Sequence, residues 1–236
     1  MIRAAFDIET VSPMVSDDER PEFGNPHHFE LQSAGIAIEE DGEVETVRHL
    51  TRDGWGAEHE LALIEDIMDT LETVSPDVTY TFNGEDFDLF LLSERARINA
   101  NSADAQNPYA RRTDFESVVG HEDLQPDAWA AFGNYTTLEE ALIGAGVFDD
   151  EDDLPTTHIT DFDHGIDHTA WSWKNPASDD VDILESGDVA VIGEHYLDGL
   201  EDGRDDEQFQ QLQEMLDHYV RNDVALLFDL ADARPY

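Results

Sequence analysis

The sequence predicts an α/β fold in which a mixed β-sheet is flanked by α-helices. Strand-like segments dominate its N-terminal part, and amphipathic helical segments alternate with a further strand after them. The length of 236 residues suits one domain of moderate size, and the 40% of hydrophobic residues can fill its core. We therefore expect a single domain over residues 1–236.

The predicted elements of the first half follow each other closely. A first strand covers residues 2–9, and strands over 31–40 and 43–50 flank the turn signal Asp41-Gly42, which favours a hairpin. Apolar residues at helical spacing predict a helix over 57–73, which Ser75-Pro76-Asp77 ends. A strand over 78–82 and a helix over 86–98 come next.

The second half is predicted to be mostly helical. Thr137 and Glu140 form a capping signature for a short helix over 138–145. Five consecutive acids at 149–153 predict a solvated loop, and residues 154–187 show no clear period. We expect an acidic insertion around 149–187, without assigned elements, and then helices at about 188–199 and 207–231.

The charge is unusually negative. Fifty-seven acidic residues against twelve basic ones give −45, and only one of the basic residues, Lys174, is a lysine. Such repulsion strains a compact fold in dilute buffer, whereas molar salt screens it. Because the acids are spread along the whole chain, we expect adaptation to a salt-filled cytoplasm, as in halophilic archaea. Recruitment of a basic partner by these acids is the alternative.

Several classes of protein are disfavoured. Without cysteine there are no disulfides and no cysteine-based zinc sites. The N-terminus lacks the pattern of a signal peptide, and the apolar runs are too short to span a bilayer. These features predict a cytoplasmic protein without membrane contacts. There is also no basic patch of the kind that ordinary nucleic-acid binders carry.

Two carboxylates share one face of the first predicted strand. In FDIET, Asp7 and Glu9 are two residues apart, so they project to the same side, while Phe6 and Ile8 take the other. Acidic residues are depleted in strands, and neighbouring like charges repel. The pair therefore requires a compensating cation or an exposed polar face.

A third carboxylate follows the strand over 78–82. In FNGEDFD, Asn83-Gly84 closes that strand with a turn, and Asp86 is placed to cap the next helix. Asp88 falls in the first helical turn, where the helix dipole favours a negative charge. Capping alone explains Asp86 better than Asp88.

The last predicted helix carries a fourth carboxylate in its apolar stripe. Asp223 interrupts this stripe on the side expected to face the core, and Tyr219 lies four residues earlier on the same face. A buried carboxylate must be paired, protonated or bound to metal. An arginine such as Arg95 could pair with Asp223 instead of a metal.

Together the carboxylates favour hard divalent cations. Mg²⁺ and Mn²⁺ prefer carboxylate oxygens, and two such ions about 3.5–4 Å apart can activate a water and stabilise a leaving oxygen. The dispersed set Asp7, Glu9, Asp88 and Asp223 is the right ligand type for that arrangement.

The three segments FDIET, FNGEDFD and YVRND resemble, in this order, the motifs of the 3′–5′ exonucleases of the DEDD superfamily, which have a ribonuclease H-like fold. The closest resemblance is to the proofreading domain of family B DNA polymerases and its stand-alone relatives. Four residues separate Asn83 from Asp88, as in the polymerase-type second motif, and YVRND matches the tyrosine-x-x-x-aspartate of the third. The resemblance spans residues 1–232, although 100–187 contribute little.

The resemblance implies a free-standing or subunit exonuclease that acts with two divalent cations, Mg²⁺ or Mn²⁺, on single-stranded 3′ ends of DNA or RNA. It implies that Asp7, Glu9 and Asp223 hold the first ion. Asp7 is expected to bridge to the second, with Asp88 contributing directly or through water. Tyr219 is expected to orient the attacking water, and Thr10 and Asn83 to border the substrate.

Other readings stay open. A silent nucleic-acid-binding or scaffold module of the same fold is disfavoured because all four carboxylates and Tyr219 are present. A metal-dependent phosphatase could use the same acids.

His218 stands where a sister branch has a histidine base, but the second motif favours Tyr219. Trp171 and Trp173 could stack on bases. A lesser metal candidate comprises His158, Asp161, Asp163, His164, Asp167 and His168.

Overall fold

The computed structural model describes residues 1–16, 19–111, 115–166 and 182–234. Its strands are β1 (Ile2–Val11), β2 (Glu30–Glu40), β3 (Glu43–Thr51), β4 (Val78–Thr81) and β5 (His121–Asp123). The α-helices are α1 (Ala57–Val74), α2 (Leu89–Ser102), α3 (Phe115–Val118), α4 (Gln125–Phe132), α5 (Leu138–Gly144), α6 (Ser186–Glu201) and α7 (Glu207–Asp232). A π-helical turn, η1 (Gly84–Asp88), precedes α2, and the 3-10 turns are η2 (Glu151–Asp153) and η3 (Ile159–Asp161).

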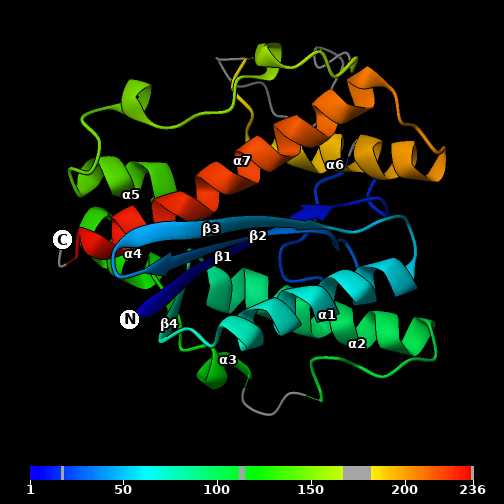
Figure 1. The fold of residues 1–236 in the computed structure, drawn as a ribbon, viewed down its shortest axis with the longest axis horizontal. Coiled ribbons are helices and arrows are strands. Elements are labelled where there is room, and N and C mark those ends of the chain that lie inside the picture. Colours follow the sequence, from blue (N-terminus) through cyan, green and yellow to red (C-terminus); the bar gives the residue numbers. More distant parts are fainter. Residues whose placement is uncertain (17–18, 112–114, 167–181, 235–236) are drawn as a thin grey trace.

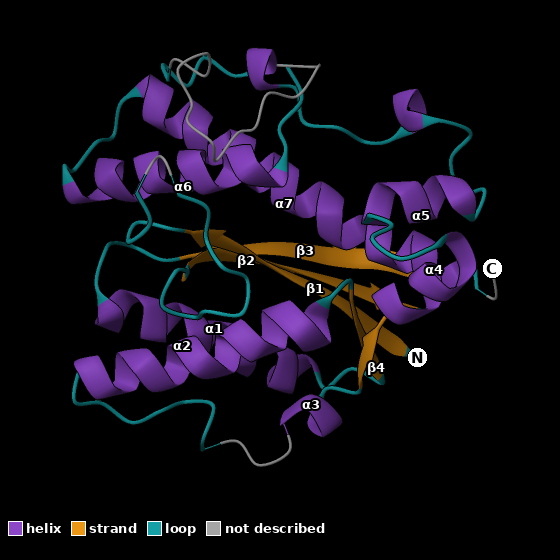
Figure 2. Cartoon of the chain, turned by 180° about the vertical axis from the view of Figure 1, so that it is seen from behind, coloured by secondary structure: helices purple, strands orange, loops and turns teal. Residues whose placement is uncertain are grey.

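The five strands form one mixed sheet in the order β3-β2-β1-β4-β5. The strands β1, β2 and β3 pair in antiparallel fashion, whereas β4 runs parallel to both β1 and β5. Helices α1 and α2 cover one face, while α5, α6 and α7 lie on the other (Figures 1 and 2). The expected α/β architecture with a ribonuclease H-like mixed sheet is confirmed.

The two faces of β1 have different partners. Phe6 and Ile8 pack in the core beneath α1 and α2. Ala5 belongs to the core on the opposite side, which includes Val224 and Leu227 of α7. Since side chains alternate along a strand, Asp7 and Glu9 share the α7 face with Ala5. The expected separation of the acids from Phe6 and Ile8 is therefore confirmed.

A glycine lets α7 approach the sheet directly beside the acids. Gly35 of β2 is the partner of Asp7 in the β1–β2 register. A Cβ at Gly35 would lie 2.5 Å from Cγ1 of Val224 and 2.7 Å from Cγ1 of Val220. Because real Cβ atoms do not come so close, this glycine permits the contact that seats Asp223 next to β1.

Most predicted elements match the structure, with two local corrections. The helix expected at 86–98 is instead the π turn at Gly84–Asp88 followed by α2, and the acidic run expected as loop contains η2. The turn forms because the Asp150 carboxylate accepts a hydrogen bond from the amide of Asp152. The capping pair of Thr137 and Glu140 at α5 is confirmed, with both reciprocal hydrogen bonds present.

Candidate metal centre

Three carboxylates from two distant segments meet at the junction of β1 and α7. Asp7, Glu9 and Asp223 each offer an oxygen, and these three atoms lie within 4.8 Å of one another. The β1–β2 register also shifts between Glu9 and Thr10. Such irregularities bend a strand and redirect its side chains, here at the end of β1 that carries the acids.

Asp88 is placed by the unusual turn after β4. Asn83 adopts a left-handed conformation with φ of 68°, which asparagine tolerates better than most residues. A Cβ at Gly84 would lie 2.1 Å from Oγ1 of Thr81, so only glycine fits there. The turn delivers Asp88 to a buried position with 3% exposure. Its Oδ2 atom has no hydrogen-bond partner.

The expected capping role of Asp86 is wrong. Asp86 is exposed and α2 has no side-chain cap. Instead, Asp123 at the end of β5 accepts hydrogen bonds from the backbone amides of Asn83 (2.9 Å), Glu85 (3.0 Å) and Gln125 (3.0 Å). The start of the turn is thus held from a neighbouring strand, because a carboxylate with two oxygens can satisfy several orphan amides at once.

The role of Asp123 in holding this turn was not predicted from the sequence. The acid followed by Gln125-Pro126 is a recognisable helix-start signature, which could have located α4. Nothing local could have shown that the same carboxylate also binds a turn about forty residues earlier, because this contact depends on the parallel pairing of β4 and β5.

One pocket contains every residue predicted for the site. Its volume is about 470 Å³, and its lining includes Asp7, Glu9, Thr10, Asn83, Asp88, Tyr219 and Asp223. A second pocket shares Tyr219, Asp223 and Glu139 with the first. The structure thus brings these residues together, whereas their chemical roles remain predictions.

Burial and crowding disfavour ionisation of the acids. Desolvation is the largest cause throughout, and it raises the pKa of Asp7 to about 7. The pKa of Glu9 is raised well above its usual value by burial and by the charges of Asp7, Asp223 and Asp88. Burial and neighbouring acids likewise raise the pKa values of Asp88 and Asp223. Without a cation the cluster therefore retains protons near neutral pH.

Tyr219 lies in the pocket with the acids, while His218 lies outside its lining. Burial, followed by the charges of Asp223, Glu9 and Asp7, raises the pKa of the Tyr219 phenol well above its usual value. The exposed His218 ring instead contacts Oγ1 of Thr157 at 2.8 Å. The side chains of the two neighbours diverge, as expected one step apart on a helix.

Arg95 does not pair with Asp223. Its guanidinium donates two hydrogen bonds to Glu60, with lengths of 2.8 and 2.6 Å. Throughout the described part of the chain, the ion pairs of the arginines go to acids outside the pocket. The pairing of Arg95 with Asp223 is therefore wrong, because α2 directs Arg95 towards Glu60 of α1.

A divalent cation fits this cluster on two observations. Among the residues that the structure describes, three carboxylates converge without a compensating arginine, and the buried Oδ2 of Asp88 lacks a hydrogen-bond partner. Buried anions of this kind need a counter-charge or a proton. Within the ranges that the structure describes, this is the one group of three or more acidic or histidine side chains close enough to hold an ion.

The other residues that the sequence suggested for metal binding or base stacking are not arranged as a site in the described part of the chain. His158, Asp161, Asp163 and His164 form no metal-holding group among the described residues, and His158 instead lies 3.3 Å from the Asp182 carboxylate. Asp167, His168, Trp171 and Trp173 lie outside the described residues.

No helix within the described ranges is long and apolar enough to cross a membrane.

The pocket also has an aromatic wall that the sequence analysis missed. Phe23 and Phe29 of the loop after β1 and Phe87 of η1 line it and contact each other with ring centroids 5.6 to 5.9 Å apart. Phe23 is 72% exposed, which is unusual for so large an apolar side chain. A loop connecting two strands gave no periodic signal for this cluster.

Fold and site define a ribonuclease H-like α/β domain with a buried carboxylate centre. Residues 15–118 match the exonuclease domain of DNA polymerase family B. The whole fold is similar to the family B DNA polymerase from the hyperthermophilic archaeon Pyrobaculum calidifontis, with a TM-score of 0.57 and 17% identity, covering 98% of this chain and 24% of that one. The two matches support the resemblance to a proofreading-type exonuclease domain.

Two facts limit how far the matches reach. The family match includes Asn83 and Asp88 but not Asp7, Glu9, Tyr219 or Asp223, which the folded structure brings to the same pocket. The chain spans about a quarter of the polymerase, so the activities of that whole protein do not transfer with the fold. No curated protein matches the sequence.

Proposed function

We propose that this protein is a metal-dependent 3′–5′ exonuclease that removes nucleotides from single-stranded 3′ ends. The observation that supports it most is the convergence of Asp7, Glu9 and Asp223 within 4.8 Å. Asp88 lines the same pocket, and its buried Oδ2 has no hydrogen-bond partner among the described residues. The match of residues 15–118 to the family B exonuclease domain supports the same reaction class.

Each acid has a defined place in the proposal. Asp7, Glu9 and Asp223 would hold one Mg²⁺ or Mn²⁺, because an oxygen of each already lies within 4.8 Å of the other two. Asp7 would be shared with a second ion, towards which Asp88 contributes directly or through water. When bound, two such ions supply a lowered pKa for the attacking water and charge stabilisation for the leaving oxygen.

Tyr219 would position the nucleophilic water. Its raised pKa keeps the phenol protonated at neutral pH, so the hydroxyl donates a hydrogen bond and takes no part as a base. The water oxygen forms a bond to phosphorus as the bond from phosphorus to O3′ breaks. The products are a nucleoside 5′-monophosphate and a shortened strand whose O3′ takes up a proton.

The aromatic wall supports a single-stranded substrate. Phe23 and Phe87 present ring surfaces in the same pocket as the acids. Stacking of a base on an aromatic ring contributes about 1–3 kcal/mol and requires an unpaired, splayed base. Because the chain carries −45 and counterion release contributes little in molar salt, stacking and metal–phosphate bonds would provide most of the affinity.

A digestion assay tests the proposal. Single-stranded DNA and RNA with a labelled 5′ end are incubated in molar KCl with Mg²⁺ or Mn²⁺, since the charge calls for high salt. We expect stepwise shortening from the 3′ end, which EDTA abolishes. Full activity in EDTA would refute the metal dependence, whereas binding without any hydrolysis would leave the silent-module alternative in its place.

A further inference from the structure

The loop between β1 and β2 forms one wall of the pocket. Pro21, Phe23 and Phe29 from this loop line the cavity that holds the acids. Phe23 is largely exposed and is held by ring contacts to Phe29 at 5.9 Å and Phe87 at 5.8 Å. A side chain in such a position depends on the backbone around it to stay in place.

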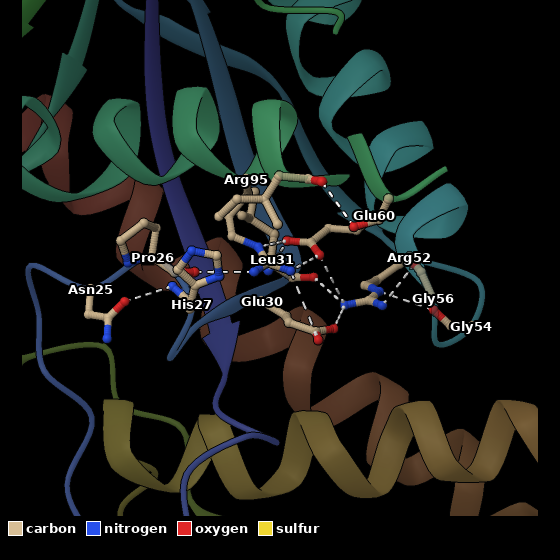
Figure 3. Close-up of polar contacts among 12 residues, drawn as sticks. Asn25, Pro26, His27, Glu30, Leu31, Arg52, Gly54, Gly56, Glu60 and Arg95 are labelled. Atoms are coloured by element: carbon tan, nitrogen blue, oxygen red, sulfur yellow. Dashed lines mark hydrogen bonds and ion pairs between the residues drawn. The ribbon is translucent and has the colours of Figure 1, made fainter. Parts of the chain in front are cut away.

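A buried arginine anchors that backbone. The Nη1 atom of Arg95 donates a hydrogen bond to the carbonyl oxygen of Pro26 at 3.1 Å, midway between Phe23 and Phe29 in the chain. Figure 3 shows Arg95 reaching the loop from α2, with Glu60 of α1 beside it. The Nε and Nη2 atoms of Arg95 bind the two oxygens of Glu60 at 2.8 and 2.6 Å.

Glu60 extends the anchor to the end of the loop. Its Oε1 atom also accepts a hydrogen bond of 2.9 Å from the amide of Leu31, at the start of β2. The Arg95–Glu60 pair thus holds the loop at Pro26 and at its junction with the sheet. Both side chains are buried, with 6% and 1% exposure. Neither lines the pocket with the acids.

Buried ion pairs of this kind are weak evidence for stability, because their desolvation offsets much of their attraction. Nearby Arg52 binds Glu30 at 2.8 Å and lies 3.9 Å from Glu60, so the cluster is balanced in charge. The feature that apolar residues could not reproduce is the donation of a hydrogen bond to the loop. This points to a positional role.

We propose that the Arg95–Glu60 pair is a positioning device that holds the exposed ring of Phe23, packed on the buried Phe29, ready to stack on a substrate base. The inference rests on the proposed function, because it assigns the ring of Phe23 to the nucleic-acid strand. The pair acts through the loop and never touches the metal ligands. Its loss should therefore weaken substrate binding while sparing the chemical step.

The test uses the double variant Glu60→Gln/Arg95→Gln in the full chain. It changes no net charge, and its glutamine at 60 still offers an oxygen to Leu31, but the side chain at 95 becomes too short to reach Pro26. We expect KM for single-stranded DNA to rise about tenfold, the loss of roughly one base stack. The value of kcat should stay within about twofold, and Mn²⁺ binding measured by calorimetry should be unchanged.

A second buried pair provides the matched control. Arg3 and Glu39 have 8% and 7% exposure and lie away from the loop, in β1 and β2. The variant Arg3→Gln/Glu39→Gln should leave KM unchanged. If it raises KM as much as the Glu60/Arg95 variant, the effect is general loosening and the positional role is wrong.

A double-mutant cycle with Phe23→Ala decides whether the pair acts through the ring. Phe23→Ala alone should raise KM to a similar extent, and combining it with Glu60→Gln/Arg95→Gln should add nothing. Additive effects would overturn the proposal. If the double variant does not fold, Arg95→Lys serves in its place, because lysine keeps the charge but cannot bind Glu60 and Pro26 together.

Hydrogen exchange separates this inference from the proposed function. In metal-free protein, amides of residues 19–29 should exchange faster in the Glu60/Arg95 variant than in the wild type, with the rest of the chain unchanged. Equal exchange would refute the anchor, whatever the activity. An inactive wild type with altered exchange in the variant would instead refute the exonuclease and retain the anchor.

Discussion

The molecule contains two largely buried acidic regions whose negative charges are compensated in different ways. Beneath the loop after β1, Glu30 and Glu60 are matched by Arg52 and Arg95 in a compact network. Across the sheet, on the α7 side, Asp7, Glu9 and Asp223 converge, and none of the arginines that the structure describes forms an ion pair with them. One region is neutralised from within, and the other requires protons or a cation from outside.

This difference indicates which of the two regions is suited to binding a cation. The chain has only twelve basic residues, and two of them lie in one buried network, whereas no described arginine pairs with its tightest carboxylate cluster. A fold selected for stability alone would not crowd unpaired acids in this way. The unpaired region should therefore control activity, and the paired region should control order.

The sharpest test of the contrast is Asp7→Ala. We expect hydrolysis of 3′ ends to fall about a thousandfold or more, because the shared ligand of both ions is lost. Thermal stability in chelator should stay the same or rise, since one anion leaves a crowded cluster. Digestion rate and melting temperature, measured on the same preparation, check both parts. Near-normal hydrolysis would contradict the two-metal centre.

The opposite result is expected in the paired region. Arg95→Met leaves Glu60 buried with only the more distant Arg52, 3.9 Å away. Breaking a buried pair from one side costs about 3–5 kcal/mol, so the free energy of unfolding should drop by that order. Denaturant titration in molar KCl measures it. A drop no larger than that of the exposed pair variant Arg97→Met would show that the network contributes little.

Within the unpaired region, Tyr219 and His218 should differ. Tyr219→Phe removes the hydroxyl that would orient water and should lower kcat about ten- to a hundredfold with metal affinity nearly intact. His218→Ala should have a small effect, because that ring is exposed and outside the pocket lining. Steady-state kinetics with calorimetry of Mn²⁺ binding compare the two. A rate transition near the histidine pKa that disappears in His218→Ala would reverse the assignment.

Local patterns allowed much of this architecture to be predicted. The strands β1 to β4 and the helices α1, α6 and α7 follow alternation or helical spacing closely, so their bounds differ by only a few residues from those expected. The acids were also identifiable, because polar residues in apolar stripes conflict with packing. The single-domain organisation stays a prediction.

The errors concern contacts between distant segments. Asp86 was expected to cap a helix, but Asp123 from β5 satisfies the turn instead. Arg95 was expected as a possible partner of Asp223, but α2 turns it towards Glu60 on α1. In both cases the sequence contained more than one acid that could make the contact. Only the tertiary arrangement decided between them, which is why composition and spacing were insufficient.

The smallest expected effect is a dependence of stability and metal binding on pH. The folded pKa of Asp7 is raised to about 7, whereas in the unfolded chain it has its usual value of 3.8. Between these values the folded state keeps a proton that the unfolded state loses, so in chelator this group's stabilisation falls as pH rises from about 4 to 7. A bound cation replaces that proton and compensates the negative charge of the carboxylates. Metal affinity should accordingly increase up to about tenfold from pH 6 to 7, with proton release.

Calorimetry of Mn²⁺ binding in buffers of different ionisation enthalpy measures that released proton directly. Asp7→Asn removes both this titration and a proposed ligand, so the proton release should be lost together with most of the Mn²⁺ affinity. Glu60→Gln/Arg95→Gln should retain the wild-type pH dependence, since the paired region already holds its counter-charges. A wild-type affinity independent of pH would mean that the acids are ionised before the cation arrives. The electrostatic distinction between the two regions would then be wrong.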